Sequence, residues 1–150
     1  MAGELYLVDT NILIRWVQPG VPDFELVRRA IQRLEDSNDI PCYTSQNLGE
    51  FWNVLTRPAN RNGYGLALDG VLPRTQEVEA RFRLLPDDLQ IHLEWRRLLV
   101  DCRISGVQVH DARLAAAMHV HAVNRILTFN AKDFARFTDI EAISPAEFVR

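Results

Sequence analysis

The chain has 150 residues, of which 47% are hydrophobic, so it can close one hydrophobic core and we expect a single domain over residues 1–150. Its formal net charge of −3 excludes a protein that binds nucleic acid through an overall basic field, and any nucleic-acid contact must be local. It has no apolar run long enough to span a bilayer and no basic and apolar leader of the secretory kind, which predicts a cytoplasmic protein without membrane contact.

The first predicted element is a buried strand that ends at Asp9 and continues into a helix. Apolar residues run without a break up to Asp9 and then recur at helical spacing over residues 10–14. A short continuous run is typical of an interior parallel strand, and open parallel sheets bind ligands at the carboxyl ends of their strands. Asp9 is therefore either a helix cap, for which Asp is favoured, or a residue that takes part in chemistry.

Two helices separated by a second strand are predicted next. Apolar residues at three- and four-residue steps indicate an amphipathic helix over residues 24–34, and residues 40–43 form a short strand. Thr44 or Ser45 then caps a helix on which Glu50 lies off the buried stripe. A lone Glu on a helix is ordinarily a solvated charge. The polar ridge that contains it consists of Asn47, Glu50, Asn53 and Arg57.

The middle of the chain carries fewer signals. Residues 58–73 are rich in Gly and Asn without a sustained period, which predicts a long loop that is either functional or disordered. A helix capped by Thr75 is expected to reach about Leu85, and another helix is expected to begin near Pro86. We interpret both helices as scaffold.

A second isolated carboxylate, Asp111, lies in the first turn of a predicted alanine-rich helix. The helix dipole favours an acid there by about 0.3–1 kcal/mol, which explains Asp111 without any function. Residues 125–129 then form an apolar strand followed by Asn130 and Asp133, so polar residues follow this strand as they follow the first. Residues 139–143 are expected to add a last strand, and Pro145 to begin a terminal helix.

Acids thus recur at the ends of the predicted elements, and together they indicate a cation site. Oxygen ligands without matching Lys or His suit Mg²⁺ or Mn²⁺, which keep waters and bind substrate phosphates. A pair of such ions roughly 3.5–4 Å apart can activate water and stabilise the leaving oxygen of a phosphodiester displacement. The residues concerned are Asp9, Glu50, Asp111, Asn130 and Asp133.

Four segments in this order resemble the PIN-domain ribonucleases, and within them the VapC-type toxins of bacterial toxin–antitoxin systems. They are residues 7–14, 47–58, 109–118 and 126–134, so the resemblance spans essentially the whole chain. It implies an α/β fold with a single PIN-like domain, in which helices flank a central, mostly parallel sheet.

The resemblance also implies roles for individual residues. Asp9, Glu50 and Asp111 would be the catalytic acids that hold Mg²⁺ or Mn²⁺, with Asn11 and Thr128 orienting them from close by.

After the three acids Asp9, Glu50 and Asp111, the chain departs from the family pattern at the fourth residue of the site, Asn130. Many members carry Asp where this chain has Asn130, and Asn supplies a carbonyl oxygen but no charge. The site would hold one negative charge fewer unless Asp133 reaches it. Asp133 is either a metal ligand or the cap of the following helix, and the sequence leaves both open.

The leading hypothesis is a metal-dependent endoribonuclease that acts as a toxin and cleaves structured or single-stranded RNA by metal-activated water. The resemblance implies a cognate antitoxin that inserts Arg or Lys among the acids, and a homodimer. The alternative is a degenerate PIN scaffold that binds RNA or a protein partner without turnover. A phosphoaspartate enzyme is a weaker hypothesis, because many of these carry a second Asp where this chain has Asn11. The candidate phosphate contacts are Arg15, Arg57, Arg61 and Arg113.

Overall fold

A five-stranded parallel sheet forms the centre of the computed structural model, which describes residues 3–150. Its order is β3-β2-β1-β4-β5, and every neighbouring pair of strands is parallel. The fold therefore confirms the predicted α/β class, with the first strand in the middle of the sheet. The strands are β1 (Leu5–Val8), β2 (Ile40–Thr44), β3 (Arg83–Leu85), β4 (Arg125–Leu127) and β5 (Glu141–Ile143).

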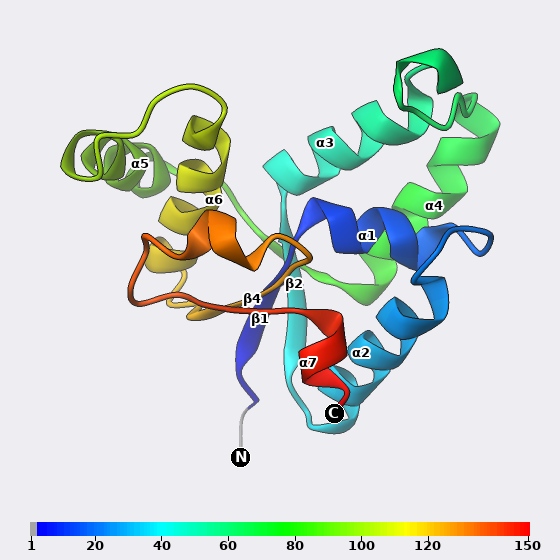
Figure 1. Cartoon of the computed structure of the whole chain (residues 1–150), viewed down its shortest axis with the longest axis horizontal. Helices are drawn as coiled ribbons and strands as arrows, with labels where there is room; N and C mark the ends of the chain where they lie inside the picture. The colour runs from blue at the N-terminus through cyan, green and yellow to red at the C-terminus, as the bar shows by residue number, and fades with distance from the viewer. Residues whose placement is uncertain (1–2) are drawn as a thin grey trace.

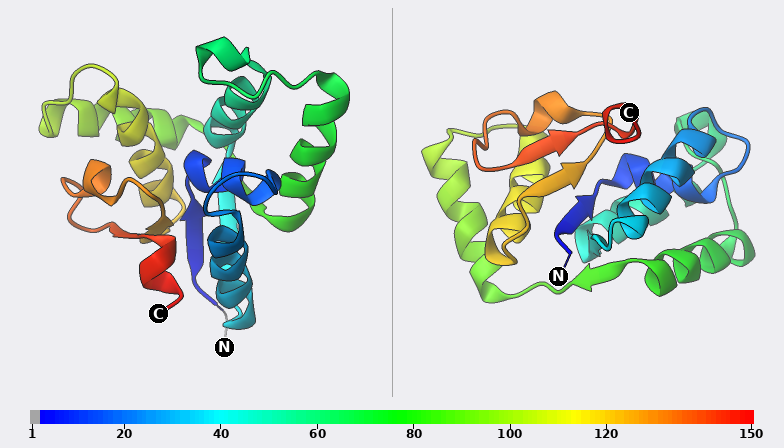
Figure 2. Two further views of the ribbon diagram at one scale, coloured as in Figure 1. Left: turned by 45° about the vertical axis from the view of Figure 1, so that its right-hand side comes forward. Right: turned by 90° about the horizontal axis from the view of Figure 1, so that it is seen from below.

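Helices cover both faces of the sheet (Figures 1 and 2). One face packs against α1 (Thr10–Val17), α2 (Phe24–Asp36), α3 (Ser45–Thr56) and α4 (Leu68–Arg81), and the other against α5 (Leu89–Asp101) and α6 (Gln108–Val120). The short α7 (Pro145–Phe148) contacts α2, and two 3-10 helices, η1 (Ala59–Arg61) and η2 (Ala131–Phe134), lie in connections. None of the helices within residues 3–150 has the length and apolar character needed to cross a bilayer.

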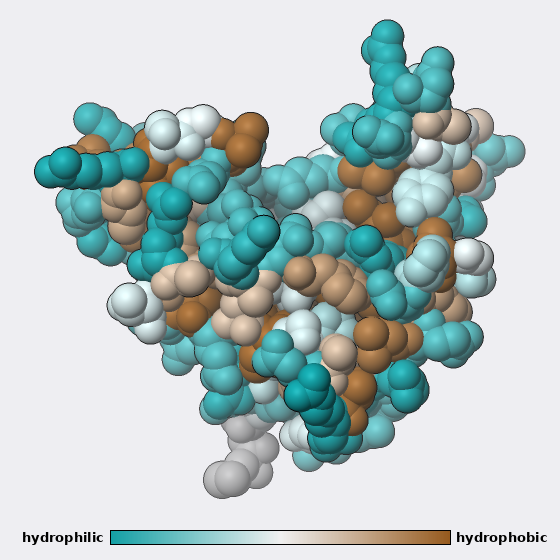
Figure 3. Space-filling model, viewed as in Figure 1, coloured by the Kyte–Doolittle hydropathy of each residue, from teal (hydrophilic) through white to brown (hydrophobic). Residues whose placement is uncertain are grey.

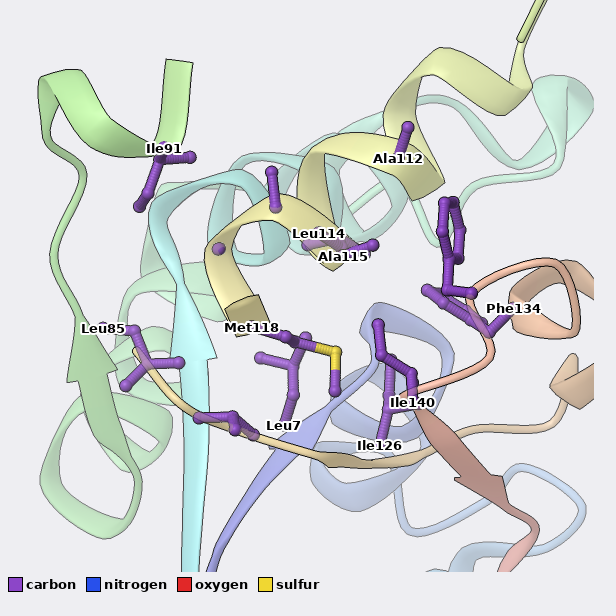
Figure 4. Packing of buried hydrophobic residues seen from close by; sticks show 14 of the residues in the cluster. Leu7, Leu85, Ile91, Ala112, Leu114, Ala115, Met118, Ile126, Phe134 and Ile140 are labelled. Carbon is purple, nitrogen blue, oxygen red and sulfur yellow. The ribbon is translucent and has the colours of Figure 1, made fainter. Parts of the chain in front are cut away.

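The central strands bury side chains on both faces, because successive residues of a strand point in opposite directions. Leu7 and Ile126 pack with Met118 in the core under α5 and α6 (Figure 4). Their neighbours Val8 and Leu127 pack in the core under α1–α4. All five side chains are fully buried. Burial on both faces explains why the strands are continuous apolar runs in the sequence.

The segment between residues 58 and 86 differs from the expected one. Helix α4 begins at Leu68 and contains Pro73, so the second half of the expected loop is helical. Thr75 does not cap a helix; it lies inside α4, where its hydroxyl donates to the Val71 carbonyl at 3.0 Å. The chain then forms β3 where the helix was expected to continue.

Both differences have a physical reason. Pro73 is exposed and removes only one helical hydrogen bond, so the helix continues through it. Strand β3 is a three-residue edge strand that pairs with β2, and its Arg83 and Leu84 are exposed. An edge strand this short shows no hydrophobic period in the sequence.

Polar residues at the carboxyl ends of β1 and β2 begin the helices that follow them. The side chain of Asp9 caps α1, since its Oδ1 accepts from the Thr10 amide at 2.8 Å. Thr44 and Asn47 form a capping box at α3, in which the Thr44 Oγ1 accepts from the Asn47 amide at 3.1 Å and the Asn47 Oδ1 accepts from the Thr44 amide at 2.9 Å. These caps bring polar side chains to one edge of the sheet.

Candidate functional site

A pocket of about 370 Å³ lies at this edge, beside the carboxyl end of β1. The chain passes from β1 to β2 on one side and returns to β4 on the other, so the order reverses at β1, where open parallel sheets hold their ligands. The space-filling view shows the surface hollowed between the α5–α6 side and the α3–α4 side (Figure 3). The polar residues that line the pocket are Asp9, Thr10, Asn11, Glu50, Asn53, Arg57, Asp111, Asn130 and Asp133.

Asp9 is 8% exposed and is held through both carboxylate oxygens. Its Oδ2 accepts from the Thr128 hydroxyl at 2.7 Å, while its Oδ1 accepts from the Thr10 amide. Thr128 follows β4 and Asp9 follows β1, and the two strands are neighbours in the sheet. Asp9 therefore caps α1 and also lines the pocket, so the two interpretations of this residue are compatible.

Asn11 acts on Asp9 through Thr128. The Asn11 Nδ2 donates to the Thr128 Oγ1 at 3.5 Å, and the Asn11 Oδ1 accepts from the Phe129 amide at 3.4 Å. The Asn130 amide also donates to the Thr128 Oγ1, at 3.0 Å. Asn11 thus contacts the segment after β4, and Thr128 makes the direct contact with Asp9.

Glu50 is likewise held through both carboxylate oxygens, by residues that the sequence did not single out for this role. The Thr10 hydroxyl donates to its Oε2 at 2.8 Å, and the Gln46 amide donates to its Oε1 at 3.1 Å. The buried Asn47 donates to the Thr10 Oγ1 at 3.2 Å and so orients that hydroxyl. Asn47 was visible as part of the polar ridge, but nothing local in the sequence connects Thr10 to Glu50.

The acids of the pocket affect one another. Burial raises the pKa of Asp9 above its usual range, against hydrogen bonds from Thr128 and Thr10 that lower it. Burial, together with the negative charges of Asp9, Asp133 and Glu50, raises the pKa of Asp111 to about 6. Both acids thus bear the repulsion of their neighbours.

The donor set fits a hard divalent cation. Within residues 3–150, none of the pocket acids forms an ion pair with a Lys, Arg or His side chain. A cation would relieve their repulsion, and carboxylate and amide oxygens are the ligands that Mg²⁺ and Mn²⁺ favour. The acids line the pocket separately: over the described part of the chain no three His, Cys, Asp or Glu side chains are already gathered as an ion site.

The structure tests one of the two interpretations of Asp133, the helix cap. Asn130 is the residue that precedes η2, and no side chain caps this helix. Asp133 lies inside η2 and lines the pocket together with Asn130. Its negative charge acts on both Asp9 and Asp111. Asp133 therefore brings the pocket the charge that Asn130 lacks.

Two of the four predicted phosphate contacts, Arg57 and Arg61, lie at the end of α3 and in η1. Arg57 lines the pocket, and its guanidinium donates to the Asn62 carbonyl at 2.9 Å. Arg61 is exposed on η1 and does not line the pocket.

The other two arginines also form hydrogen bonds within the protein. Arg15 donates to the Asn11 carbonyl at 2.8 Å. Arg113 donates to the Gln46 Oε1 at 3.1 Å and forms an ion pair with Asp87 at 3.3 Å. Arg57 is thus the only one of the four that borders the pocket directly.

The chain matches a known protein family. The family profile of the PIN domain matches residues 6–140. A comparison with curated proteins gave no significant match.

Similar solved structures include VapBC2 from Rickettsia felis bound to a DNA fragment from its promoter, at 14% identity over 93% of this chain and 98% of that chain, with a TM-score of 0.70. VapBC-1 from nontypeable Haemophilus influenzae is 19% identical over 95% of this chain and 98% of that chain, with a TM-score of 0.64. VapC20 from Mycobacterium tuberculosis, a toxin that cleaves the sarcin-ricin loop, is 16% identical over 89% of this chain and 95% of that chain, with a TM-score of 0.64. At these identities the likeness shows a shared fold.

Proposed function

Because the chain belongs to the PIN-domain family, we propose that it is a metal-dependent endoribonuclease of the VapC toxin type. One observation carries the proposal: four carboxylates, from Asp9, Glu50, Asp111 and Asp133, line a single pocket at the carboxyl end of β1. Gathering acids in this way is unfavourable unless a cation neutralises them. The fold shared with VapC20, a toxin that cleaves the sarcin-ricin loop, supports the proposed activity.

The chain's own residues prepare the site in three ways. Asp9 and Glu50 are oriented in advance, because a donor fixes each of their four carboxylate oxygens. Asp111 and Asp133 complete the acidic wall from α6 and η2, and Asn130 adds an amide group. Bound Mg²⁺ or Mn²⁺ would supply an activated water and offset the charge on the leaving oxygen of the scissile phosphate.

The proposed substrate is RNA that is held by local contacts. The net charge of −3 gives no general attraction for a polyanion, so arginines near the pocket must bind the phosphates. Arg57, which lines the pocket, would bind a phosphate there. Arg15, Arg61 and Arg113 do not line the pocket and would contact the RNA strand farther away or after rearrangement.

The proposal extends to protein partners. Several proteins of the same fold were solved with the other half of a toxin–antitoxin pair, including a toxin-antitoxin complex from Klebsiella pneumoniae. We propose that a cognate antitoxin inserts an Arg or Lys among the pocket acids. The homodimer implied by the family resemblance belongs to the same proposal.

The proposal is tested by Mn²⁺ titration calorimetry and by cleavage of total RNA with the metal-free and metal-loaded protein. Asp9→Asn should reduce cleavage by roughly 100-fold or more, since it removes an anionic ligand of the cation. Its circular dichroism spectrum should stay unchanged, because Asn retains helix-capping ability.

Asp36→Asn is the matched control, because Asp36 is an exposed acid at the end of α2. It should cleave RNA as the wild type does. Full activity of Asp9→Asn would contradict the proposal. A wild-type protein that neither binds Mn²⁺ nor cleaves RNA would instead be the scaffold that binds without turnover.

A further inference from the structure

We propose that Gln46 is a positioning residue. It would set the distance between the two walls of the pocket, of which α3 with Glu50 forms one and α6 with Asp111 forms the other. This inference rests on the proposed function, because it concerns the same acids and the same cation. It assigns a role to a neutral side chain that does not itself line the pocket.

The Gln46 amide nitrogen connects two elements. It donates to the Glu50 Oε1 at 3.1 Å, one turn along α3, and to the carbonyl oxygen of His110 at 2.9 Å, in the first turn of α6. An amide NH₂ has two hydrogens, so one group can serve both acceptors. His110 directly precedes Asp111. Gln46 thus links the residue that carries one pocket acid to the backbone beside another.

The other end of the same amide is fixed as well. The Gln46 Oε1 accepts from the Arg113 Nη1 at 3.1 Å, and the second Arg113 nitrogen pairs with Asp87 at 3.3 Å. The guanidinium has only donors, so it determines which way the Gln46 amide is turned. A reversed amide would place its oxygen against Glu50 and its NH₂ against Arg113, and both contacts would be repulsive.

No other side chain makes this connection in the described part of the chain. Helices α3 and α6 pack against opposite faces of the sheet. Within residues 3–150, both side-chain hydrogen bonds between these helices involve Gln46. Repulsion between the acids tends to separate the two walls, and this bridge over the sheet edge opposes it. Removing the bridge should therefore widen the pocket and weaken cation binding.

The variant that tests this role is Gln46→Met, which keeps the length and helix propensity of the side chain but removes its amide. We expect its Mn²⁺ affinity, measured by titration calorimetry, to fall about 10-fold, as when a group that orients a metal ligand is lost. Cleavage should need correspondingly more Mn²⁺ for its half-maximal rate, yet return towards the wild-type rate at saturating Mn²⁺. A merely structural role would not raise the Mn²⁺ requirement while leaving the rate at saturating Mn²⁺ nearly unchanged.

The matched control is Gln32→Met. The Gln32 amide also donates to an acid four residues later on its helix, Asp36, at 2.8 Å, but this pair is exposed on α2. Gln32→Met should bind Mn²⁺ as the wild type does. Both variants should melt at similar temperatures, so a change in affinity would report the pocket and not the fold.

The anchoring by Arg113 is tested by a double-mutant cycle. Arg113→Met should weaken Mn²⁺ binding in the same direction, and the double variant should bind no worse than Gln46→Met alone, since Arg113 acts through Gln46. Additive losses would overturn this part of the inference. If Gln46→Met did not fold, reduced affinity in Arg113→Met would still support the bridge, and unchanged affinity would overturn it.

The remaining outcomes separate the two proposals. Equal Mn²⁺ affinity in Gln46→Met and the wild type overturns the role of Gln46 and leaves the nuclease proposal intact. A wild-type protein without saturable Mn²⁺ binding overturns both.

Discussion

The individual residue that best shows the effect of crowding acids is Asp111. Burial, with the charges of Asp9, Asp133 and Glu50, raises its pKa from 3.8 to about 6. In the unfolded chain this carboxyl loses its proton near its usual pKa, whereas the folded protein holds the proton until about pH 6. The folded state is therefore penalised as the pH rises through this window, and the penalty is complete above it.

We expect Asp111→Asn to stabilise the metal-free protein above about pH 6, because it removes the unfavourable charge. After allowance for solvent screening the gain should be on the order of 1 kcal/mol, which raises the melting temperature by about 2–4 °C. Melting with a chelator at about pH 8 and pH 4 checks this, and the gain should vanish at the lower pH. An unchanged melting temperature at the higher pH would refute the effect.

Among the elements, α5, α6 and the segment before β5 are joined by one histidine. The Nδ1 of His119 lies 2.6 Å from the Glu94 Oε2, and its Nε2 lies 2.8 Å from an oxygen of Asp139. Glu94 also pairs with Arg97 at 2.7 Å. The hydrogen bond from Arg97, with a further one from His119, lowers the pKa of Glu94 from 4.5 to about 2. Glu94 thus holds these elements together as an anion.

Glu94→Gln should lower the free energy of unfolding at neutral pH by about 1–2 kcal/mol, since Arg97 is half exposed and its contribution is screened. The depressed pKa means that this stabilisation is fully present above about pH 4.5 and is lost as the pH falls through about 2. Urea unfolding at about pH 7 and pH 3 checks this. The difference in the free energy of unfolding between the wild type and Glu94→Gln should be smaller at the lower pH than at the higher. Glu79→Gln, at an exposed acid of α4, should leave stability unchanged at both. A difference that grew in acid would contradict the assignment.

Elements with a strong local pattern could be predicted from the sequence, and those without one could not. The apolar runs before Asp9 and Asn130 predicted β1 and β4, because strands buried on both faces contain little else. The start of α4 was missed because an exposed Pro73 reads as the end of a loop. Strand β3 was missed because its three residues carry no local strand pattern; it is defined by its pairing with β2.

The same distinction holds for the site. Asp9 and Asp111 were singled out because they follow a strand or lie in the first turn of a helix, whereas Glu50, which lies inside α3, was assigned a role through the family resemblance. The hydrogen bond from Thr10 to Glu50 was not predicted, because the two residues are 40 positions apart in the sequence. The one from Gln46 to His110 was not predicted either, because it joins residues 64 positions apart. Those contacts depend on how α3 and α6 meet over the sheet, which no local pattern contains.

For the molecule as a whole, charge determines what it attracts. A net charge of −3 and an acidic recess favour a basic protein segment over a nucleic acid. Under the proposed function, RNA would be bound by local arginines and a cation, whereas an antitoxin could use the acids directly. The two would compete for the same pocket.

The product of the adjacent gene, if it is the antitoxin, should inhibit RNA cleavage, and replacing its pocket-facing Arg or Lys by Met should relieve inhibition. Inhibition should weaken as salt is raised from about 0.1 M towards 1 M, because screening shortens the range of the attraction. The assay is RNA cleavage with and without that protein. Equal activity in both would contradict the proposed partner.

The way in which Asp9 and Glu50 are held also leaves every one of their carboxylate oxygens able to bind a cation. Each of their four oxygens already accepts one hydrogen bond. A carboxylate oxygen has two lone pairs, so each of these oxygens keeps one for a cation. A cation could therefore be bound by these carboxylates without displacing the hydrogen bonds that orient them. The two acids would thus keep their orientation when a cation binds, so little rearrangement of the pocket would accompany its binding.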